Sequence, residues 1–351
     1  MKQRICLMLF VIVNLGAIAI ALRTSEDQGT NFTVRTLTLP DHGNGNVTMD
    51  YIAYDPATGF LWVPAINIGV VYVVDTSDDS IREIPDFATN VVEFGGRKRT
   101  QGPSGVSVGD GAVYIGDRAD SSICAVDAKT LARRTCGHID STPDGVVYVA
   151  STKEVWVTAP RDNSVRILDS QSLTQKEKLT FEGRPEGYAV DAKRGRFYMN
   201  YEDKDLTTAI DLKTHKTVAK WPAGCGEDGP HGISVDQDHG FLFVACSTSA
   251  EVLDAGHSGE RLSSINTGDG VDDLSFSPVT RTLYVGAAKA ARLTIARVDA
   301  VGKLTQVAQV PTREGARNGV VTSAGTVYLA HSQLGQFAGL IVVSPIRKVV
   351  A

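Results

Sequence analysis

The apolar residues of this chain are gathered in short runs that are separated by clusters of glycine, aspartate and serine. Residues 228–267 show the pattern clearly. The runs there are Ile233–Val235, Phe241–Ala245 and Val252–Leu253, and a weaker alternation follows at Leu262 and Ile265. Runs of this length, rich in β-branched and aromatic residues and bounded by turn formers, predict strands rather than helices. Four strands in about forty residues predict one blade of a β-propeller, which must pack against further copies of itself.

Two markers repeat this unit along the chain. The second strand of each unit carries an aromatic residue, at Trp62, Tyr114, Trp156, Tyr198, Phe243, Tyr284 and Tyr328. The third strand ends in an acid in six units, at Asp75, Asp127, Asp169, Asp211, Asp254 and Asp299, and Ser344 takes this place in the seventh. Because the two markers share one period, we predict an all-β fold, a seven-bladed β-propeller of four-stranded antiparallel blades. Residues 33–351 would form this single domain.

The segment Thr33–Leu39 alternates as a strand but belongs to no repeat unit. The last unit lacks an outer strand, since only residues 344–351 follow Leu340–Val343. We therefore expect the N-terminal strand to become the outer strand of blade seven, which closes the ring and removes an exposed sheet edge. Arg347–Val350 could supply that strand instead.

One interval is longer than the others because Phe87–Gln101 is inserted between blades one and two. The insert carries Arg97, Lys98 and Arg99 directly after two glycines. We interpret it as a solvated surface loop, and a binding arm is the alternative.

The N-terminus predicts export. Lys2 and Arg4 precede the apolar run Ile5–Leu22, and Ala19–Ala21 supplies the small residues that a signal peptidase requires. We predict a signal peptide over residues 1–21 and a periplasmic or secreted protein. An uncleaved anchor is the alternative, and only that would place the chain at a membrane.

Export changes the interpretation of the cysteines. Four remain once Cys6 is removed with the leader, and an even number in an oxidising compartment is typical of disulfides. Cys124 and Cys136 lie on the two strands of one predicted hairpin, and Cys225 and Cys246 lie at one rim of blade five. We predict these two pairs. Free thiols or a metal site are the alternatives, although neither pair has the close Cys-x-x-Cys spacing of a zinc site.

Composition and motifs exclude several classes of function. The net charge of −5 offers no basic excess to neutralise phosphates, so nucleic acid is an unlikely partner. The sequence has no G-x-S-x-G elbow, no H-E-x-x-H, no P-loop and no dinucleotide fingerprint. We assign no catalytic residue and expect a monomer.

Each unit begins with a short motif that turns the chain onto its innermost strand. Four units carry proline, a variable residue and glycine, at Pro103–Gly105, Pro143–Gly145, Pro185–Gly187 and Pro230–Gly232, while Met49–Tyr51, Val271–Asp273 and Arg317–Gly319 start the others. Proline fixes the approach of the chain, and glycine permits close packing of inner strands. We expect the middle residues to form a ring at the channel mouth: Asp50, Ser104, Asp144, Glu186, His231, Asp272 and Asn318. Arg317 is included in the predicted binding site.

This ring has two chemical interpretations besides a solvated, polar channel entrance. Its carboxylates could hold Ca2+ or Mg2+, which prefer oxygen ligands, or bind a cationic or hydroxylated ligand. The loops after the second strands open onto the same face and carry Arg118, Arg161, Tyr201, Lys204 and Lys289. These outer groups would suit an anionic or zwitterionic ligand.

The repeat resembles a known family. The segments G-R-P-E-G-Y-A-V-D (183–191), D-G-P-H-G-I-S-V-D (228–236) and F-L-F-V-A-C (241–246) resemble the YVTN β-propeller repeat family, specifically exported YncE-like proteins. The units at 49–55, 269–276 and 311–318 follow the same pattern, and Trp156–Ala159 is the nearest match to the Tyr-Val-Thr-Asn namesake. The resemblance implies a seven-bladed, usually extracytoplasmic propeller without an established reaction. Some related propellers bind DNA, and more distant ones are lactonases or lyases with a metal in the channel.

We therefore expect a scaffold that binds a small ligand or a protein through its channel face. The alternative is a metal-assisted hydrolase, lactonase or lyase with a divalent cation in the central channel.

Overall fold

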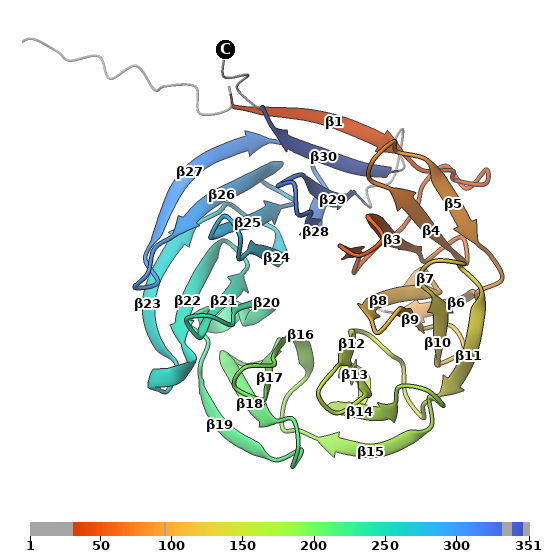
Figure 1. Cartoon of the computed structure of the whole chain (residues 1–351), viewed down its shortest axis with the longest axis horizontal. Helices are drawn as coiled ribbons and strands as arrows, with labels where there is room; N and C mark the ends of the chain where they lie inside the picture. Colours follow the sequence, from red (N-terminus) through yellow and green to blue (C-terminus); the bar gives the residue numbers. More distant parts are fainter. Residues whose placement is uncertain (1–30, 95, 332–338, 347–351) are drawn as a thin grey trace, which may run out of the picture.

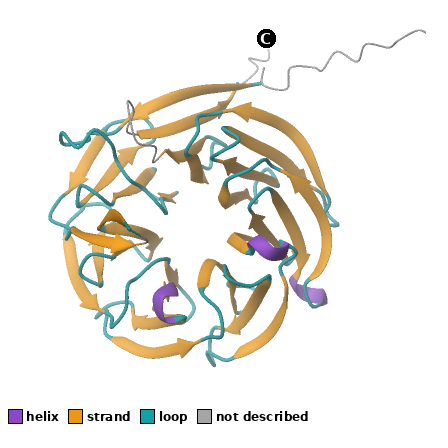
Figure 2. Cartoon of the chain, turned by 180° about the vertical axis from the view of Figure 1, so that it is seen from behind, coloured by secondary structure: helices purple, strands orange, loops and turns teal. Residues whose placement is uncertain are grey.

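The computed structural model describes residues 31–94, 96–331 and 339–346, which form seven four-stranded antiparallel sheets around a central axis (Figures 1 and 2). The predicted fold class is confirmed. Each sheet runs from an inner strand beside the axis to an outer strand at the rim.

The strands of the first four blades follow the predicted order. Blade one contains β2 (Ala53–Asp55), β3 (Phe60–Ala65), β4 (Val70–Asp75) and β5 (Ile81–Ile84). Blade two contains β8 (Pro103–Gly109), β9 (Ala112–Asp117), β10 (Ser122–Asp127) and β11 (Arg133–His138). Blade three contains β12 (Val146–Val149), β13 (Glu154–Ala159), β14 (Ser164–Asp169) and β15 (Gln175–Thr180). Blade four contains β16 (Pro185–Asp191), β17 (Arg196–Tyr201), β18 (Leu206–Asp211) and β19 (Thr217–Pro222).

The remaining blades complete the ring. Blade five contains β20 (Pro230–Asp236), β21 (Phe241–Cys246), β22 (Ser249–Asp254) and β23 (Glu260–Asn266). Blade six contains β24 (Val271–Ser277), β25 (Thr282–Ala287), β26 (Arg292–Val298) and β27 (Leu304–Pro311). Blade seven contains β28 (Ala316–Val321), β29 (Val327–His331), β30 (Gly339–Pro345) and β1 (Phe32–Thr38). Short 3-10 helices lie at Pro160–Asp162, Gly226–Asp228 and Ala255–His257.

The N-terminal strand closes the ring, as predicted. Strand β1 pairs antiparallel with β30 along its whole length, from Phe32 opposite Pro345 to Thr38 opposite Gly339. In Figure 1, β1 lies outside β30, so the two ends of the propeller share one sheet. The alternative closing segment, residues 347–350, lies outside the described residues.

The insert between blades one and two is a hairpin, and its prediction as a loop was wrong. Strands β6 (Asn90–Phe94) and β7 (Arg97–Gln101) pair as a separate two-stranded sheet. Gly96, between the two strands, has φ +73°, the positive φ that a tight hairpin turn requires. Arg97, Lys98 and Arg99 are exposed on β7.

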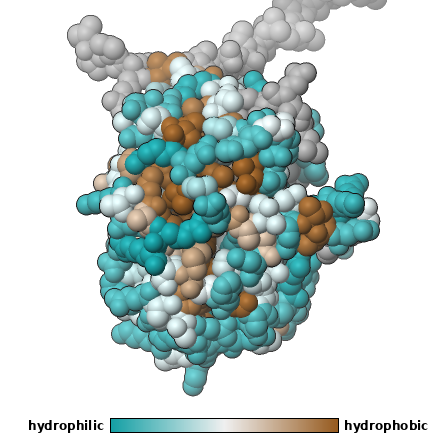
Figure 3. All heavy atoms as spheres, turned by 90° about the vertical axis from the view of Figure 1, so that its right-hand side faces the viewer, coloured by the Kyte–Doolittle hydropathy of each residue, from teal (hydrophilic) through white to brown (hydrophobic). Residues whose placement is uncertain are grey.

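The two periodic markers have separate physical causes. The aromatic residues of the second strands are buried and fill the spaces between neighbouring blades. Phe243 of blade five, for example, lies 4.6 Å from Phe276 of blade six between ring centres. The acids instead accept hydrogen bonds from the turn that follows, as Asp127 does from the amides of Lys129 and Thr130 at 3.0 and 2.8 Å. The outer wall mixes hydrophilic side chains with small apolar areas (Figure 3).

Both predicted disulfides are present. Cys124 and Cys136 face each other on β10 and β11, and Cys225 is joined to Cys246 at the end of β21. Two disulfides point to an oxidising, extracytoplasmic location. The predicted signal peptide lies outside the described residues. Within the described part of the chain, no helix is long and apolar enough to cross a membrane.

Candidate functional site

The inner strands begin with a β-bulge that builds the channel mouth. In β16, Pro185 pairs with Tyr201 and Tyr188 pairs with Met199, so Glu186 and Gly187 together oppose one residue of β17. The same shift occurs at the start of β20, β24 and β28. A bulge breaks the regular alternation of side chains and redirects them. In these four blades it therefore gives the inner strand a variable residue at one end of the channel.

Glycine follows the variable residue because the next inner strand passes very close. A Cβ added at Gly105 would overlap the carbonyl oxygen of Asp144, and one added at Gly187 would overlap that of His231. Both obstacles are backbone atoms, which cannot rotate away. The predicted packing role of these glycines is confirmed.

Blade seven uses a different residue at the mouth from the one predicted. Ala316 and Gly319 pair with β29 as Pro230 and Ile233 pair with β21. Arg317 therefore takes the mouth position, and Asn318 takes the position that is glycine in blades two to five. Asn318 is only 2% exposed. Gly319 follows Asn318 just as glycine follows the mouth residue in blades two to five. The sequence alone therefore placed the mouth residue of blade seven one position too late.

In blade two, Arg118 occupies the place that was predicted for Ser104. Ser104 is fully buried, and its hydroxyl has no hydrogen-bond partner among the described residues. Arg118 follows β9 and was expected outside the ring. Its Nη2 atom lies 2.7 Å from Asp50 Oδ2 and also contacts Asp144 Oδ1, so it links the carboxylates of blades one and three.

The other loop residues predicted near the mouth do not join this network. Tyr201 is fully buried, and Arg161 is exposed on a 3-10 helix. Lys204 Nζ lies 3.8 Å from Glu182 Oε2, and Lys289 Nζ lies 3.4 Å from Asp269 Oδ2. The ring observed at the mouth therefore consists of Asp50, Arg118, Asp144, Glu186, His231, Asp272 and Arg317.

Within this ring, Glu186 is the carboxylate that has no cationic partner among the described residues. Arg317 Nε lies 3.4 Å from Asp272 Oδ2, and His231 Nε2 lies 3.3 Å from Ser247 Oγ. Glu186 instead accepts a long hydrogen bond of 3.5 Å from the Tyr51 hydroxyl. Burial, reinforced by the nearby charges of Asp144 and other carboxylates, raises the pKa of Glu186 well above its usual value.

The ring does not fit a resident divalent cation. A guanidinium group already lies between the carboxylates of Asp50 and Asp144. Among the residues that the structure describes, no group of three or more histidine, cysteine or acidic side chains could hold a metal ion. The expected Ca2+ or Mg2+ site therefore lacks a ligand set here.

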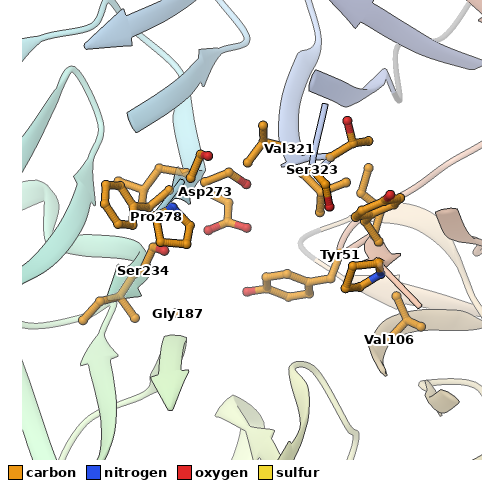
Figure 4. A pocket seen from close by; sticks show the side chains of 18 of the residues that line it. Tyr51, Val106, Gly187, Ser234, Asp273, Pro278, Val321 and Ser323 are labelled. Carbon is orange, nitrogen blue, oxygen red and sulfur yellow. The ribbon is translucent and has the colours of Figure 1, made fainter. Parts of the chain in front are cut away.

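Beyond the ring, the channel contains a cavity of about 480 Å³ (Figure 4). Its lining residues come from six blades, which places it on the axis. The ring of Tyr51 extends across the opening toward the side that carries Asp273 and Ser234 (Figure 4). Tyr51 and Tyr188 have ring centres 6.0 Å apart. Sequence reasoning missed this cavity, although Tyr51 and Asp273 stand where four other blades have glycine.

The chain's fold, but not its sequence, is similar to known proteins. No protein-family model matches it, and no curated protein matches it in sequence. A streptogramin B lyase structure superposes with TM-score 0.70 at 13% identity, over 91% of this chain and 100% of that chain. Virginiamycin B lyase from Staphylococcus aureus superposes with TM-score 0.68 at 12% identity, over 90% of this chain and 100% of that chain. The WD40 repeats of RRP9 superpose with TM-score 0.73 at 9% identity, over 90% of this chain and 97% of that chain. Identities this low show the fold alone: the chain is a seven-bladed β-propeller, structurally similar to WD40 and virginiamycin B lyase propellers.

Proposed function

We propose that this chain is an exported, YncE-like binding scaffold whose channel mouth recognises a positively charged group on a small ligand or a partner protein. The observation that carries the proposal is Glu186, a half-buried carboxyl group with no cationic partner among the described residues. A ligand ammonium or guanidinium group would supply that partner.

The charge balance of the mouth supports a cationic visitor. Four carboxyl groups lie in the ring, and Arg118 and Arg317 are the two cations that form ion pairs with them among the described residues. Like charges held together at low dielectric raise one another's pKa, and an added cation relieves that repulsion. Because Arg118 is shared between two acids, the unbalanced charge is concentrated near Glu186.

The rigid blades favour recognition over chemistry. Glu186, His231, Asp272 and Arg317 sit on bulges fixed by backbone pairing, so residues distant in sequence are held around one axis. The metal-assisted hydrolase or lyase remains the second candidate, since some structural neighbours are lyases. The absence of a ligand set among the described residues makes it the weaker one.

The proposal is tested with model side chains. N-acetyl-lysine amide and N-acetyl-arginine amide are titrated into the labelled protein and followed by NMR shifts, with N-acetyl-norleucine amide as the neutral control. We expect the two cations to bind and Glu186→Gln to weaken them about tenfold, since a charged hydrogen-bonded pair contributes about 1.5–3 kcal/mol.

Glu182→Gln is the matched control, because Glu182 lies in the same blade but pairs with Lys220 at the surface. It should leave the affinities unchanged. Equal affinities in wild type and Glu186→Gln would rule the mouth out. A parallel titration with CaCl2 tests the metal-dependent alternative.

A further inference from the structure

We propose that the cavity beyond the mouth is a second ligand site, and that it takes a compact organic ammonium ion with an apolar body. Its rim is formed by Pro56, Pro278 and Ser323, which follow the ends of the inner strands. The ring of charges lies where those strands begin. The two sites therefore face opposite ends of the channel, and the inference does not rest on the proposed function.

The cavity lies where the repeat departs from glycine. Blades two to five carry glycine after the mouth residue, at Gly105, Gly145, Gly187 and Gly232, whereas blades six, seven and one carry Asp273, Asn318 and Tyr51. These three blades are neighbours in the ring. Where a sequence breaks its own repeat at a crowded position, a functional reason is expected. Two of the three side chains, Asp273 and Tyr51, line the cavity.

Asp273 provides the negative charge. It is the one charged side chain among the described residues that line the cavity, and none of the described cations pairs with it. Space for its carboxyl group depends on Gly232, because a Cβ added there would overlap Asp273 Oδ1. Burial raises the pKa of Asp273 to about 7, and the neighbouring carboxyl groups of Asp272 and Asp50 act in the same direction. A bound ammonium ion would replace the missing cation.

The walls provide the aromatic surface. Tyr51, Tyr54, Tyr188 and Phe276 all line the cavity, and the rings of Tyr51 and Tyr188 are inclined by 48° to each other. The face of an aromatic ring attracts a cation within about 6 Å of its centre, and most strongly when water is excluded. Aromatic faces combined with one carboxyl group are therefore the chemistry that recognises an ammonium ion.

Size and rim composition limit the ligand further. A volume of about 480 Å³ is in the range of small-molecule pockets, about 300–1,000 Å³. Val279, which is 82% exposed, and Pro278 make one side of the opening apolar. The hydroxyl groups of Ser234 and Ser277 add hydrogen-bonding capacity along the wall. We infer an amine whose body is an aromatic ring or a short hydrocarbon.

The test compares two probes of the same shape, the phenethylammonium ion and neutral 2-phenylethanol, by isothermal titration at pH 8. We expect the amine to bind at least tenfold more tightly. Asp273→Asn should reduce amine affinity at least tenfold and leave the alcohol unaffected. Tyr51→Leu should weaken the amine, whereas Tyr51→Phe, which keeps the aromatic face, should retain most of its affinity.

Two controls separate this site from the mouth and from general charge effects. Asp269→Asn removes an exposed acid of the same blade and should change nothing, because Asp269 pairs with Lys289 outside the cavity. Glu186→Gln acts at the mouth, where the Glu186 carboxyl group contacts the Tyr51 hydroxyl, so it should weaken the amine less than Asp273→Asn does. If the two probes bind equally, if neither binds, or if Asp273→Asn keeps the amine affinity, the inference is wrong.

Discussion

The two ends of the central channel are built from the same seven inner strands, yet they differ in how their charges are balanced. At the mouth, Arg118 and Arg317 pair with three of the four carboxyl groups of the ring. In the cavity, Asp273 is surrounded by aromatic and aliphatic side chains, and no described cation pairs with it. One position along each strand separates these environments. The repeat thus supplies the frame, and single departures from it supply the chemistry.

The same contrast appears around the ring. Blades two to five keep glycine below the mouth because a Cβ there would overlap the next blade. The overlap is with backbone at Gly105 and Gly187, and with the side chains of Tyr188 and Asp273 at Gly145 and Gly232. Blades six, seven and one carry side chains at this position, and Asn318 uses its own to donate a 2.9 Å hydrogen bond to Asp50 Oδ1. One arc of the channel is therefore specialised for packing, and the other has room for polar and aromatic groups.

Opening the ring should have the largest effect, because both ends of the channel depend on closure. Deleting residues 23–40 removes β1 and exposes the edge of β30. We expect the melting temperature measured by circular dichroism to fall by about 10 °C or more. Deleting only residues 23–30 keeps β1 and should not change it. A protein without β1 that melts like the parent would contradict closure by this strand.

The second largest loss of stability is expected from replacing Arg118, the cation that two carboxyl groups share at the mouth. Arg118→Met leaves the half-buried carboxyl groups of Asp50 and Asp144 without their shared partner, and we expect a loss of about 3 kcal/mol of unfolding free energy at pH 8, the low end of the range for a buried pair. The loss should shrink at pH 5, since burial already raises the pKa of Asp144 to about 6 and the group can then be protonated. Urea denaturation at both pH values measures this. Lys204→Met, which breaks an exposed pair, should cost well under 1 kcal/mol, and an equal loss in both variants would contradict internal pairing at the mouth.

Substitutions at the position that carries glycine in blades two to five should have a moderate effect on stability, which differs between the two arcs of the channel. Gly187→Ala forces the backbone of blade five to move and should cost about 1–3 kcal/mol. Asn318→Gly makes the opposite change in blade seven and loses one hydrogen bond, about 1 kcal/mol. Denaturant melts of the two variants compare the arcs. If Gly187→Ala is neutral, the inner strands of blades four and five are not in close contact.

Removing the charge of Asp273 in the cavity should have the smallest effect, and it should raise the free energy of unfolding. Burial raises the pKa of Asp273 to about 7, above the value of about 3.9 in an unfolded chain. The folded protein then holds more protons than the unfolded chain between about pH 4 and 7, so stability falls as pH rises through this window. Asp273→Asn should flatten that fall and add about 1–2 kcal/mol at pH 8. The free energy of unfolding of wild type and Asp273→Asn is measured from pH 5 to 8. If both fall equally with pH, the raised pKa of Asp273 is contradicted.

The sequence predicts the ring better than it predicts the site. The blade number follows from two periodic markers, a buried aromatic residue in every blade and a turn acid in six. Closure follows from the strand that belongs to no repeat unit, and the disulfides follow from cysteines placed on neighbouring strands or at one rim of a blade. The site depends on contacts between blades, which leave no local pattern. The position of Arg118 after β9 placed it on the mouth face, but its pairing with acids of two neighbouring blades left no pattern in the sequence. Tyr51 and Asp273 were visible in the alignment of the motifs as departures from glycine, but their meaning depends on the space beside them.

The central claim is that the channel holds two separate sites for cations, one at Glu186 and one at Asp273. It is tested most directly by titrating N-acetyl-lysine amide and the phenethylammonium ion into wild type, Glu186→Gln and Asp273→Asn, with residue-resolved NMR shifts as the readout. The account predicts that Glu186→Gln weakens the lysine amide and Asp273→Asn the phenethylammonium ion, each about tenfold or more, and that each variant affects the other probe less. If either variant weakens both probes equally, or neither variant weakens its own probe, the two-site account is contradicted.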